Sequence, residues 1–353
     1  MTTQEPGRPG VAFADRAGGG RAVPWTEIGV ALGLDIGHSA VKVATRGGTR
    51  LFPSCVCAAI PISDRAEARR AEGDTFSAPD GNSYFVGETA QIQGSNGGPV
   101  GLYDRWIDTP EYAVLIKAAY AAARAIDPPL PGAHHGLVVM GLPASLYASQ
   151  SKRLISLARD LLGIDVLVVP QPYAPYAGLK LERNGFPAVA YAGKENYGVI
   201  EIGYYTTDFS LIQRDRPVER ASVSCGGVRI ATENLQRLLG ARGLAADMGE
   251  CEIALRERRI RNFDRNIDIT KDARAATEPM VAEIIDNANR VLESHARKVD
   301  GIILAGGGCD LVRARLAERW PHLVVPDEPR FAVAEGMRRL GEMTILSRRM
   351  GAA

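Results

Sequence analysis

The sequence predicts an α/β protein with two lobes, on three observations. Its 353 residues suffice for two domains of about 150 residues each. Short apolar strands alternate with amphipathic helices along the chain, as they do in α/β folds. One motif occurs twice: an apolar strand carries an acid, ends at a glycine turn and is followed by a second strand. The acid is Asp35 in the first copy and Glu201 in the second, a repeat that a duplicated lobe would produce.

The composition is that of a globular protein, with 46% hydrophobic and 24% charged residues. The formal net charge of +1 argues against strong direct binding to nucleic acid or to an anionic membrane. No apolar run is long enough to cross a bilayer, and the first residues, MTTQEPGRPG, lack the apolar core of an export signal. Five scattered cysteines predict a reducing compartment without disulfides, so we expect a cytoplasmic protein.

Residues 1–27 are rich in Gly, Pro and Arg and predict a flexible tail. The first lobe is expected over residues 28–190, with a small insertion at about 56–105. It opens with a hairpin that turns at Gly37. The further elements expected in this lobe are a strand within Arg50–Ile60, a strand at Tyr84–Val86, helices at Pro110–Ile126 and Ser145–Leu162, strands at Leu137–Pro143 and Val166–Pro170, and a short helix to Leu179.

The second lobe is expected over residues 191–345, with an insertion at about 226–299, and residues 346–353 are expected to form a tail. Arg256–Arg265 contains five arginines and is interpreted as a solvated helix face, with contact to an acidic partner as the alternative. The other expected elements are a strand, turn and strand over Gly198–Gln213, helices at Ala231–Leu239 and Pro279–Val299, and a strand, glycine turn and helix start over Gly301–Leu311.

The first glycine turn lies in LDIGHSAVK, from Leu34 to Lys42. Backbone amides of such a turn form an anion-binding nest, to which Ser39 adds a hydroxyl donor and Lys42 a positive charge. Asp35 cannot bind a phosphate itself, so it would act through a divalent metal, most readily Mg²⁺. An ordinary hairpin with a turn aspartate explains the same residues.

The second turn, IEIGYYTTDF, places Glu201 where the first turn has Asp35 and adds the hydroxyls of Thr206 and Thr207. Two such turns facing each other would clamp a polyphosphate and its metal from both sides; the alternative is a buried strand with a solvated Glu201. A third turn, LAGGGCDL, lacks the lysine of a P-loop and the spacing of a dinucleotide fingerprint. Its glycines allow a flat ligand to approach the backbone, although a simple glycine-rich loop remains open.

Six segments in this order resemble the actin, sugar-kinase and heat-shock-chaperone ATPase superfamily. They are LDIGHSAVK, GLP, VVPQPYAPYAGL, IEIGYYTTDF, SCGGVRIATENL and ILAGGGCDLV. RLFPSCV and YFVGETAQ also resemble stretches of actin, and the chain is most similar to bacterial plasmid-segregation actins of the ParM/StbA type. The resemblance spans about residues 28–340 and implies two βββαβα lobes with small inserted subdomains.

The resemblance implies roles for individual residues. Asp35 and Glu201 would hold the metal, although the family usually has Asp in the second loop. Gln171 would orient the attacking water and, with those two acids, form the catalytic set; capping of the following helix is its alternative role. The residues expected to contact the nucleotide are Gly37, His38, Ser39 and Lys42 in the first loop, Gly203, Tyr204, Tyr205, Thr206 and Thr207 in the second, Gly226, Gly227, Glu252 and Arg256 around the ribose and adenine, and Gly306, Gly307 and Gly308 in the adenosine turn. The Glu252 and Arg256 pair also suits a surface ion pair.

The function that the resemblance implies is that of a filament-forming ATPase. It would bind ATP (or GTP) and Mg²⁺ between its lobes, polymerise with itself, and move a plasmid through a DNA-bound adaptor. A small-molecule kinase of the same superfamily is one alternative, although no insertion is large enough for a substrate pocket. A non-polymerising nucleotide-binding scaffold is another. A chaperone is disfavoured, because no substrate-binding domain follows the ATPase region.

Overall fold

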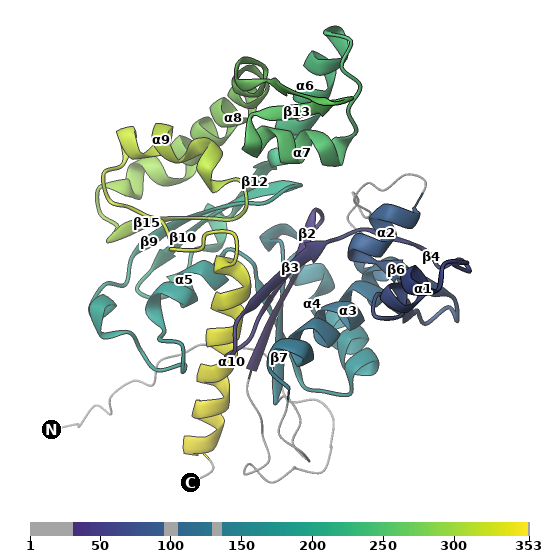
Figure 1. Ribbon diagram of the computed structural model, residues 1–353. Helices are drawn as coiled ribbons and strands as arrows, with labels where there is room; N and C mark the ends of the chain where they lie inside the picture. The colour runs from purple at the N-terminus through teal and green to yellow at the C-terminus, as the bar shows by residue number, and fades with distance from the viewer. Residues whose placement is uncertain (1–30, 95–104, 129–135, 352–353) are drawn as a thin grey trace, which may run out of the picture.

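Two sheets form the centres of two lobes, one above the other in Figure 1. The elements are those of a computed structural model, which describes residues 31–94, 105–128 and 136–351. The expected tail over residues 1–27 therefore lies outside the described residues. The two-lobed α/β fold expected from the sequence is confirmed.

The sheet of the first lobe has the strand order β3-β2-β1-β7-β8. Its first three strands are antiparallel, whereas β7 and β8 continue the sheet parallel to β1. The strands are β1 (Ala31–Ile36), β2 (Ala40–Ala44), β3 (Thr49–Pro53), β7 (Leu137–Leu142) and β8 (Val166–Pro170), and the helices packed with them are α3 (Pro110–Ile126) and α4 (Ala144–Leu162).

The sheet of the second lobe repeats this plan with the order β11-β10-β9-β15-β16, while β12 pairs with β10. Again a hairpin comes first, and two parallel strands extend the sheet on its other side. The sequence repeat is therefore a repeat of topology. The strands are β9 (Tyr197–Ile202), β10 (Thr206–Gln213), β11 (Arg216–Pro217), β12 (Val223–Gly226), β15 (Gly301–Ala305) and β16 (Leu323–Val324).

Each lobe carries an outer part, at the right of Figure 1 for the first lobe and at the top for the second. The first outer part is richer in structure than the single strand expected there. Its elements are β4 (Val56–Ala58), α1 (Arg65–Glu72), β5 (Thr75–Ser77), β6 (Ser83–Val86) and α2 (Gly87–Gln93). The second outer part consists of α6 (Val228–Ala241), α7 (Met248–Glu257), β13 (Arg259–Asn262), β14 (Arg265–Asp268) and α8 (Thr270–Ala296).

Several expected boundaries hold because their local chemistry is strong. Helix α3 begins after Thr109, whose hydroxyl accepts from the amide of Tyr112 at 3.2 Å, and Pro110 takes the first helical position, where its missing N–H costs nothing. Helix α4 ends at Gly163, which adopts a φ of 66°, the left-handed conformation that glycine tolerates best.

Two expectations in the second lobe are wrong. The helix expected to begin at Pro279 begins at Thr270, so the proline lies inside α8. Buried residues such as Ala273, Ala276 and Met280 keep the helical spacing across the proline, and their burial outweighs the lost hydrogen bond. The arginine-rich stretch Arg256–Arg265 is not one helix face either, because α7 ends at Glu257 and the β13–β14 hairpin follows.

Three further α-helices lie in the part of the chain that the structure describes: α5 (Tyr173–Lys180), α9 (Cys309–Arg319) and α10 (Ala332–Gly351). The expected tail from residue 346 is wrong, since α10 runs on to Gly351. This helix packs against α5 and the first sheet. A Cβ on Gly33 would lie 1.9 Å from the carbonyl oxygen of Ala334, and one on Gly336 would lie 1.8 Å from that of Ala174. The division of the chain at about residue 190 stays a prediction.

Candidate functional site

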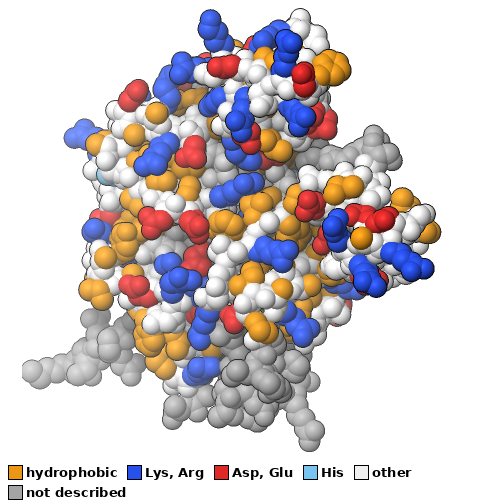
Figure 2. All heavy atoms as spheres, viewed as in Figure 1, with side chains coloured by type: hydrophobic (Ala, Val, Ile, Leu, Met, Phe, Trp, Pro, Cys, Tyr) orange, Lys and Arg blue, Asp and Glu red, His pale blue; other side chains and the backbone are white. Residues whose placement is uncertain are grey.

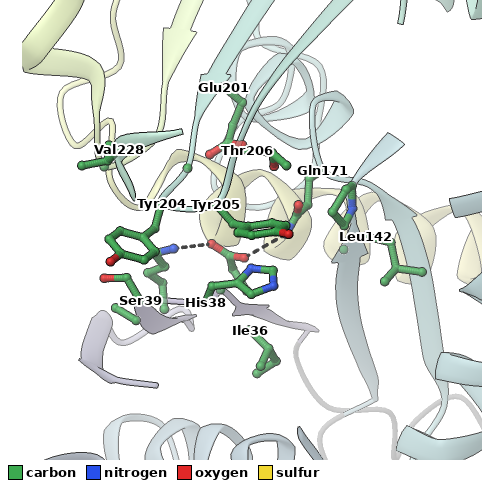
Figure 3. A pocket seen from close by; sticks show the side chains of 18 of the residues that line it. Ile36, His38, Ser39, Leu142, Gln171, Glu201, Tyr204, Tyr205, Thr206 and Val228 are labelled. Atoms are coloured by element: carbon green, nitrogen blue, oxygen red, sulfur yellow. Dashed lines mark hydrogen bonds and ion pairs between the residues drawn. The ribbon is translucent and has the colours of Figure 1, made fainter. Parts of the chain in front are cut away.

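A cleft with an empty volume of about 900 Å³ lies between the lobes, and both glycine hairpins line it. In Figure 3, Ser39 and His38 of the first turn face Tyr204, Tyr205 and Thr206 of the second. The cleft is therefore built by the two copies of the repeated motif.

Asp35 is the acid of the first turn, and it is 4% exposed. It lies directly across the β1–β2 pair from Lys42, whose Nζ is 3.0 Å from its Oδ2. The Nε2 of Gln171 donates to its Oδ1 at 3.2 Å. A buried carboxylate is stabilised by such charged and polar donors.

Gln171 follows β8 and precedes α5. No side chain caps α5, whose N-cap residue is Pro172, so the helix-capping role for Gln171 is not the one observed. The bare Cα of Gly141 leaves room for the glutamine, since a Cβ there would lie 2.8 Å from Cγ of Gln171. With its amide nitrogen on Asp35, the Gln171 side chain keeps its oxygen as an acceptor.

Glu201 is the acid of the second turn, and it is 8% exposed. Burial, reinforced by the charges of Asp208 and Asp35, raises its pKa to about 8, although Lys42 opposes the shift. Asp208 is its partner across the β9–β10 pair, and burial raises the pKa of this carboxyl too, against hydrogen bonds from Ser224 and Thr206. Negative charge is thus costly here, and a cation would relieve that cost.

Hydrogen bonds also join the lobes across the cleft. The Ser39 hydroxyl in the first lobe lies 2.9 and 2.8 Å from the two carboxylate oxygens of Glu252 on α7. Glu252 in turn forms a 2.6 Å ion pair with Arg256. Glu252 and Arg256 therefore form the ion pair that their spacing suggested. The pair is not a simple surface pair, because Glu252 is buried in the cleft and bonded to Ser39 of the first turn.

An aromatic stack forms a second link between the lobes. The ring of His38 stacks on Trp106 at 4.4 Å and lies 4.8 Å from the ring of Tyr205 in the second turn. Trp106 is 5% exposed, and its indole nitrogen has no hydrogen-bond partner among the described residues. A buried donor beside a cleft is the kind of group that a ligand oxygen satisfies.

The third turn follows β15. Gly307 and Gly308 line the cleft, whereas Gly306 lies behind it at a φ of 94°. A Cβ on Gly306 would lie 2.7 Å from Oε1 of Glu201, so the absence of a side chain at Gly306 leaves room for the Glu201 carboxylate. Arg330 completes this side of the cleft, where burial and the nearby Arg256 lower its pKa.

The structure brings most of the expected site residues together, although it does not test their roles. Those that line the cleft are Asp35, Gly37, His38, Ser39, Lys42, Gln171, Glu201, Gly203, Tyr204, Tyr205, Thr206, Glu252, Arg256, Gly307 and Gly308. Four lie outside the lining. Thr207 donates its hydroxyl to the oxygen of Gly226 at 3.1 Å, Gly227 packs under Gly203, and Gly306 supports Glu201.

Sequence reasoning missed Trp106, Tyr112, Gln150, Val228 and Arg330, all of which line the cleft. None belongs to a glycine turn. The one available signal was Trp106, a large aromatic residue at the end of a polar stretch.

Two family models match the chain in succession. Residues 33–172 match the N-terminal domain of actin-like proteins, and residues 199–318 match the C-terminal domain of the archaeal MreB-like actin homologue. No curated protein matches the sequence.

Solved structures give the same result. A 15-stranded ParM filament from Clostridium botulinum is 19% identical with a TM-score of 0.70, over 89% of this chain and 99% of that one. The archaeal actin homologue Ta0583 in complex with ADP is 21% identical with a TM-score of 0.65, over 90% and 99%. Alp7A is 14% identical with a TM-score of 0.68, over 92% and 98%. At these identities the likeness shows the fold.

The duplicated α/β fold, with paired acid-and-glycine hairpins across a cleft, agrees with both family models. The chain belongs to the actin-like superfamily, as its sequence predicted, and ParM proteins are among its structural neighbours.

Proposed function

We propose that this protein is an actin-like ATPase that binds ATP with Mg²⁺ between its lobes and assembles into filaments. The observation that carries the proposal is the meeting of two acid-and-glycine hairpins, from the two lobes, in one cleft. A ligand held by both hairpins would couple its own chemistry to the angle between the lobes. That coupling is what a nucleotide-controlled polymer needs.

The charges of the cleft fit a polyphosphate. Lys42, Arg256 and Arg330 supply positive charge from both sides, and the turn amides beside Gly37 and Gly203 would supply neutral donors. The unpaired indole N–H of Trp106 would donate to a ligand oxygen. Glu252, Tyr204 and the turn at Gly307 would then contact the nucleoside.

The acids fit a hard divalent cation. Mg²⁺ prefers oxygen ligands and binds through one or two carboxylates together with substrate phosphates. Asp35 and Glu201 would hold it. Burial raises the pKa of Glu201 because the charge of Lys42 compensates for its carboxylate only in part, and a bound cation would add to that compensation. When bound, the cation would neutralise charge that develops on the phosphates. Among the described residues no cluster of three ligating side chains is present, in accord with phosphates completing the site.

Gln171 would direct the hydrolytic water. Its Nε2 donates to Asp35 at 3.2 Å, so its oxygen can accept a hydrogen bond from a water molecule and fix the orientation of that water. Asp35 would thus act twice, once toward the cation and once in positioning Gln171.

We further propose that the filament serves plasmid segregation in the cytoplasm through a DNA-bound adaptor. The resemblance of the sequence to plasmid-segregation actins suggests this cargo, and a ParM filament is among the solved structures with the same fold. Basic and acidic side chains are interspersed over the face in Figure 2, and no helix in the described part of the chain is long and apolar enough to cross a membrane. An adaptor is therefore the more natural link to DNA than direct contact.

Purified protein with Mg²⁺ tests the proposal. Light scattering and negative-stain microscopy are followed with ATP, ADP and a non-hydrolysable analogue, and phosphate release is measured in parallel. We expect filaments with ATP and with the analogue, and disassembly as ATP is consumed. Asp35→Asn should lower hydrolysis by at least about 100-fold, whereas the exposed Asp165→Asn should not. Particles that stay monomeric with all three nucleotides would indicate a scaffold, and phosphate transfer to an added small molecule would indicate a kinase.

A further inference from the structure

The turn of the β13–β14 hairpin carries an aromatic side chain that is not packed in either core. Phe263 occupies its two-residue turn and is 90% exposed. The hairpin is anchored instead by Ile260, which is buried in the core of the second lobe. Exposing a phenylalanine forfeits the free energy of its burial, and the hairpin does not require it.

The backbone at this tip carries a second cost. Phe263 has a φ of 54°, in the region that glycine favours and bulky residues avoid. Two-residue hairpins commonly place glycine or asparagine at such a position. An exposed aromatic residue held in a strained conformation points to a role outside its own chain.

Positive charge surrounds the tip. Arg261 and Arg265 flank Phe263 and are exposed. Asp264 occupies the other turn position and forms a 3.9 Å ion pair with Arg265, between side chains that are 89% and 86% exposed. Two arginines against this one acid leave the tip with a net positive charge. Figure 2 shows further Lys and Arg side chains gathered over this outer part of the second lobe. The tip is therefore an apolar knob within a basic surface.

A groove elsewhere on the molecule has the complementary character. It lies between α5, α10 and the segment that joins β16 to α10, and its empty volume is about 1510 Å³. Apolar side chains line it, among them Leu179, Tyr191, Val325 and Phe331.

Acids dominate the rim of this base groove. Glu182, Asp327 and Glu328 are exposed there, and none of the three forms an ion pair within the part of the chain that the structure describes. One rim arginine, Arg183, has the opposite sign, and Glu335 is already paired with Arg338 and Arg339. The rim thus keeps an excess of negative charge.

The tip and the base groove lie on opposite faces of one sheet. Ile260 packs in the cluster on the α6–α8 face of the second sheet, whereas Tyr176 of α5 packs on its other face with Ile303. Figure 1 shows β13 at the top of the molecule and α5 and α10 well below it. A chain cannot bring its own tip to its own groove.

We propose that the Phe263 tip of one copy docks into the base groove of a second copy, with Arg261 and Arg265 facing Asp327 and Glu328. Because the two surfaces differ and lie on opposite sides of the subunit, the contact is head-to-tail, and it extends as an open filament when the rotation between copies does not close into a ring. This inference rests on the proposed self-assembly and names the surfaces that carry it.

A glycine substitution separates docking from folding. Phe263→Gly removes the knob and suits the positive φ, so we expect an unchanged or higher melting temperature and a critical concentration for assembly raised at least about tenfold. Ile92→Ala, which removes a 63% exposed apolar side chain from the first lobe, is the matched control and should assemble as the parent does. Parental assembly by the Phe263→Gly protein would overturn the proposal.

Charge reversal gives a sharper test. One variant carries Arg261→Glu and Arg265→Glu, the other Asp327→Arg and Glu328→Arg. Each alone presents like charges at the junction and should fail to assemble at parental concentrations. In an equimolar mixture every junction between unlike copies regains opposite charges, so alternating filaments should form. Failure of the mixture, with both variants folded, would overturn this pairing of surfaces.

These outcomes remain distinct from failure of the proposed function. Nucleotide binding by each variant is measured with a fluorescent ATP analogue and should equal that of the parent. Parental filaments with unaffected variants would overturn only the docking surfaces. A parent that binds ATP and never assembles would overturn both proposals.

Discussion

Glu201 is an acid held where an ionised acid is poorly solvated. It lies on a buried strand opposite Asp208 and close enough to Asp35 for their charges to interact. Lys42 compensates only in part, because its ammonium group is paired with Asp35. Without nucleotide and cation, the second turn therefore has a proton where the first has an ion pair.

This protonation makes stability depend on pH. The Glu201 pKa is about 8 in the folded chain against 4.5 as its ordinary value, so unfolding releases a proton between these pH values. The free energy of unfolding then falls as pH rises through this window, by up to about 1.4 kcal/mol per pH unit from this group. Glu201→Gln should remove that slope. Urea unfolding at pH 5.5, 6.5 and 7.5 without nucleotide or metal measures it.

The exposed Glu195→Gln is the matched control and should keep the parental slope. Parallel curves for Glu201→Gln and its parent would mean that this carboxyl is ionised in the folded protein.

Sequence patterns identified the turn residues because their motif is local. Asp35 and Glu201 each lie one residue before the end of a buried strand, and Gln171 directly follows another. The turns at these strand ends could therefore be located from the sequence. The Asp35–Gln171 hydrogen bond joins residues 136 positions apart, and no spacing rule predicts it. Arg330 and Trp106 reach the cleft through tertiary packing, which no local motif of the sequence encodes.

At the scale of elements, α5 and α10 form the close-packed base between the lobes. The two helices approach so closely at Gly336 that a side chain does not fit there. A Cβ added to Gly336 would lie 1.8 Å from the carbonyl oxygen of Ala174. Charged residues of α10 are satisfied within this contact. Arg338 is fully buried, pairs with Glu335 and donates to the oxygen of Arg183 at 2.9 Å.

Gly336→Ala should therefore push these helices apart. We expect the free energy of unfolding to fall by about 2 kcal/mol or more, the cost of overpacking a tight contact. Gly240→Ala is the matched control, because Gly240 also lies in a helix but a Cβ there meets nothing within 4 Å. That variant should be neutral or stabilised by up to about 1 kcal/mol. Urea midpoints measure both, and equal midpoints would contradict the packing.

Elements with strong end signals were predictable, whereas those decided by packing were not. Thr109 and Gly163 mark the ends of α3 and α4 by local chemistry. A proline normally starts or breaks a helix. Helix α8 nevertheless continues past Pro279, because buried residues on both sides of it keep the helix packed against the core. The β13–β14 hairpin has only two residues between its strands and no glycine there, so the arginine-rich sequence concealed it.

At the scale of the whole molecule, each lobe has its own apolar core. The α5–α10 base and the side chains that cross the cleft join these cores. A ligand held by both hairpins would add a further link. The lobes should therefore respond together to nucleotide.

Hydrogen exchange measures this coupling. ATP and Mg²⁺ at about 100 times Kd should stabilise the folded chain by about 2.7 kcal/mol, and protection should rise in both β1 and β9. In the Asp35→Asn variant, the nucleotide-dependent increases in protection of β1 and of β9 should both be smaller. Protection confined to one lobe would mean that the nucleotide binds without bridging the cleft.

The packing of α10 on β1 has a consequence for biosynthesis. The amide of Ala31 donates to Glu342, 311 residues later in the chain, and Val333 and Met337 cover the same sheet face as Ala31. Ribosomes add about 5–20 residues per second, so β1 is made on the order of 15–60 s before its covering helix. During that interval the nascent first lobe has an open apolar face. The core of the first lobe is therefore complete only after α10, near the end of the given sequence, has been synthesised.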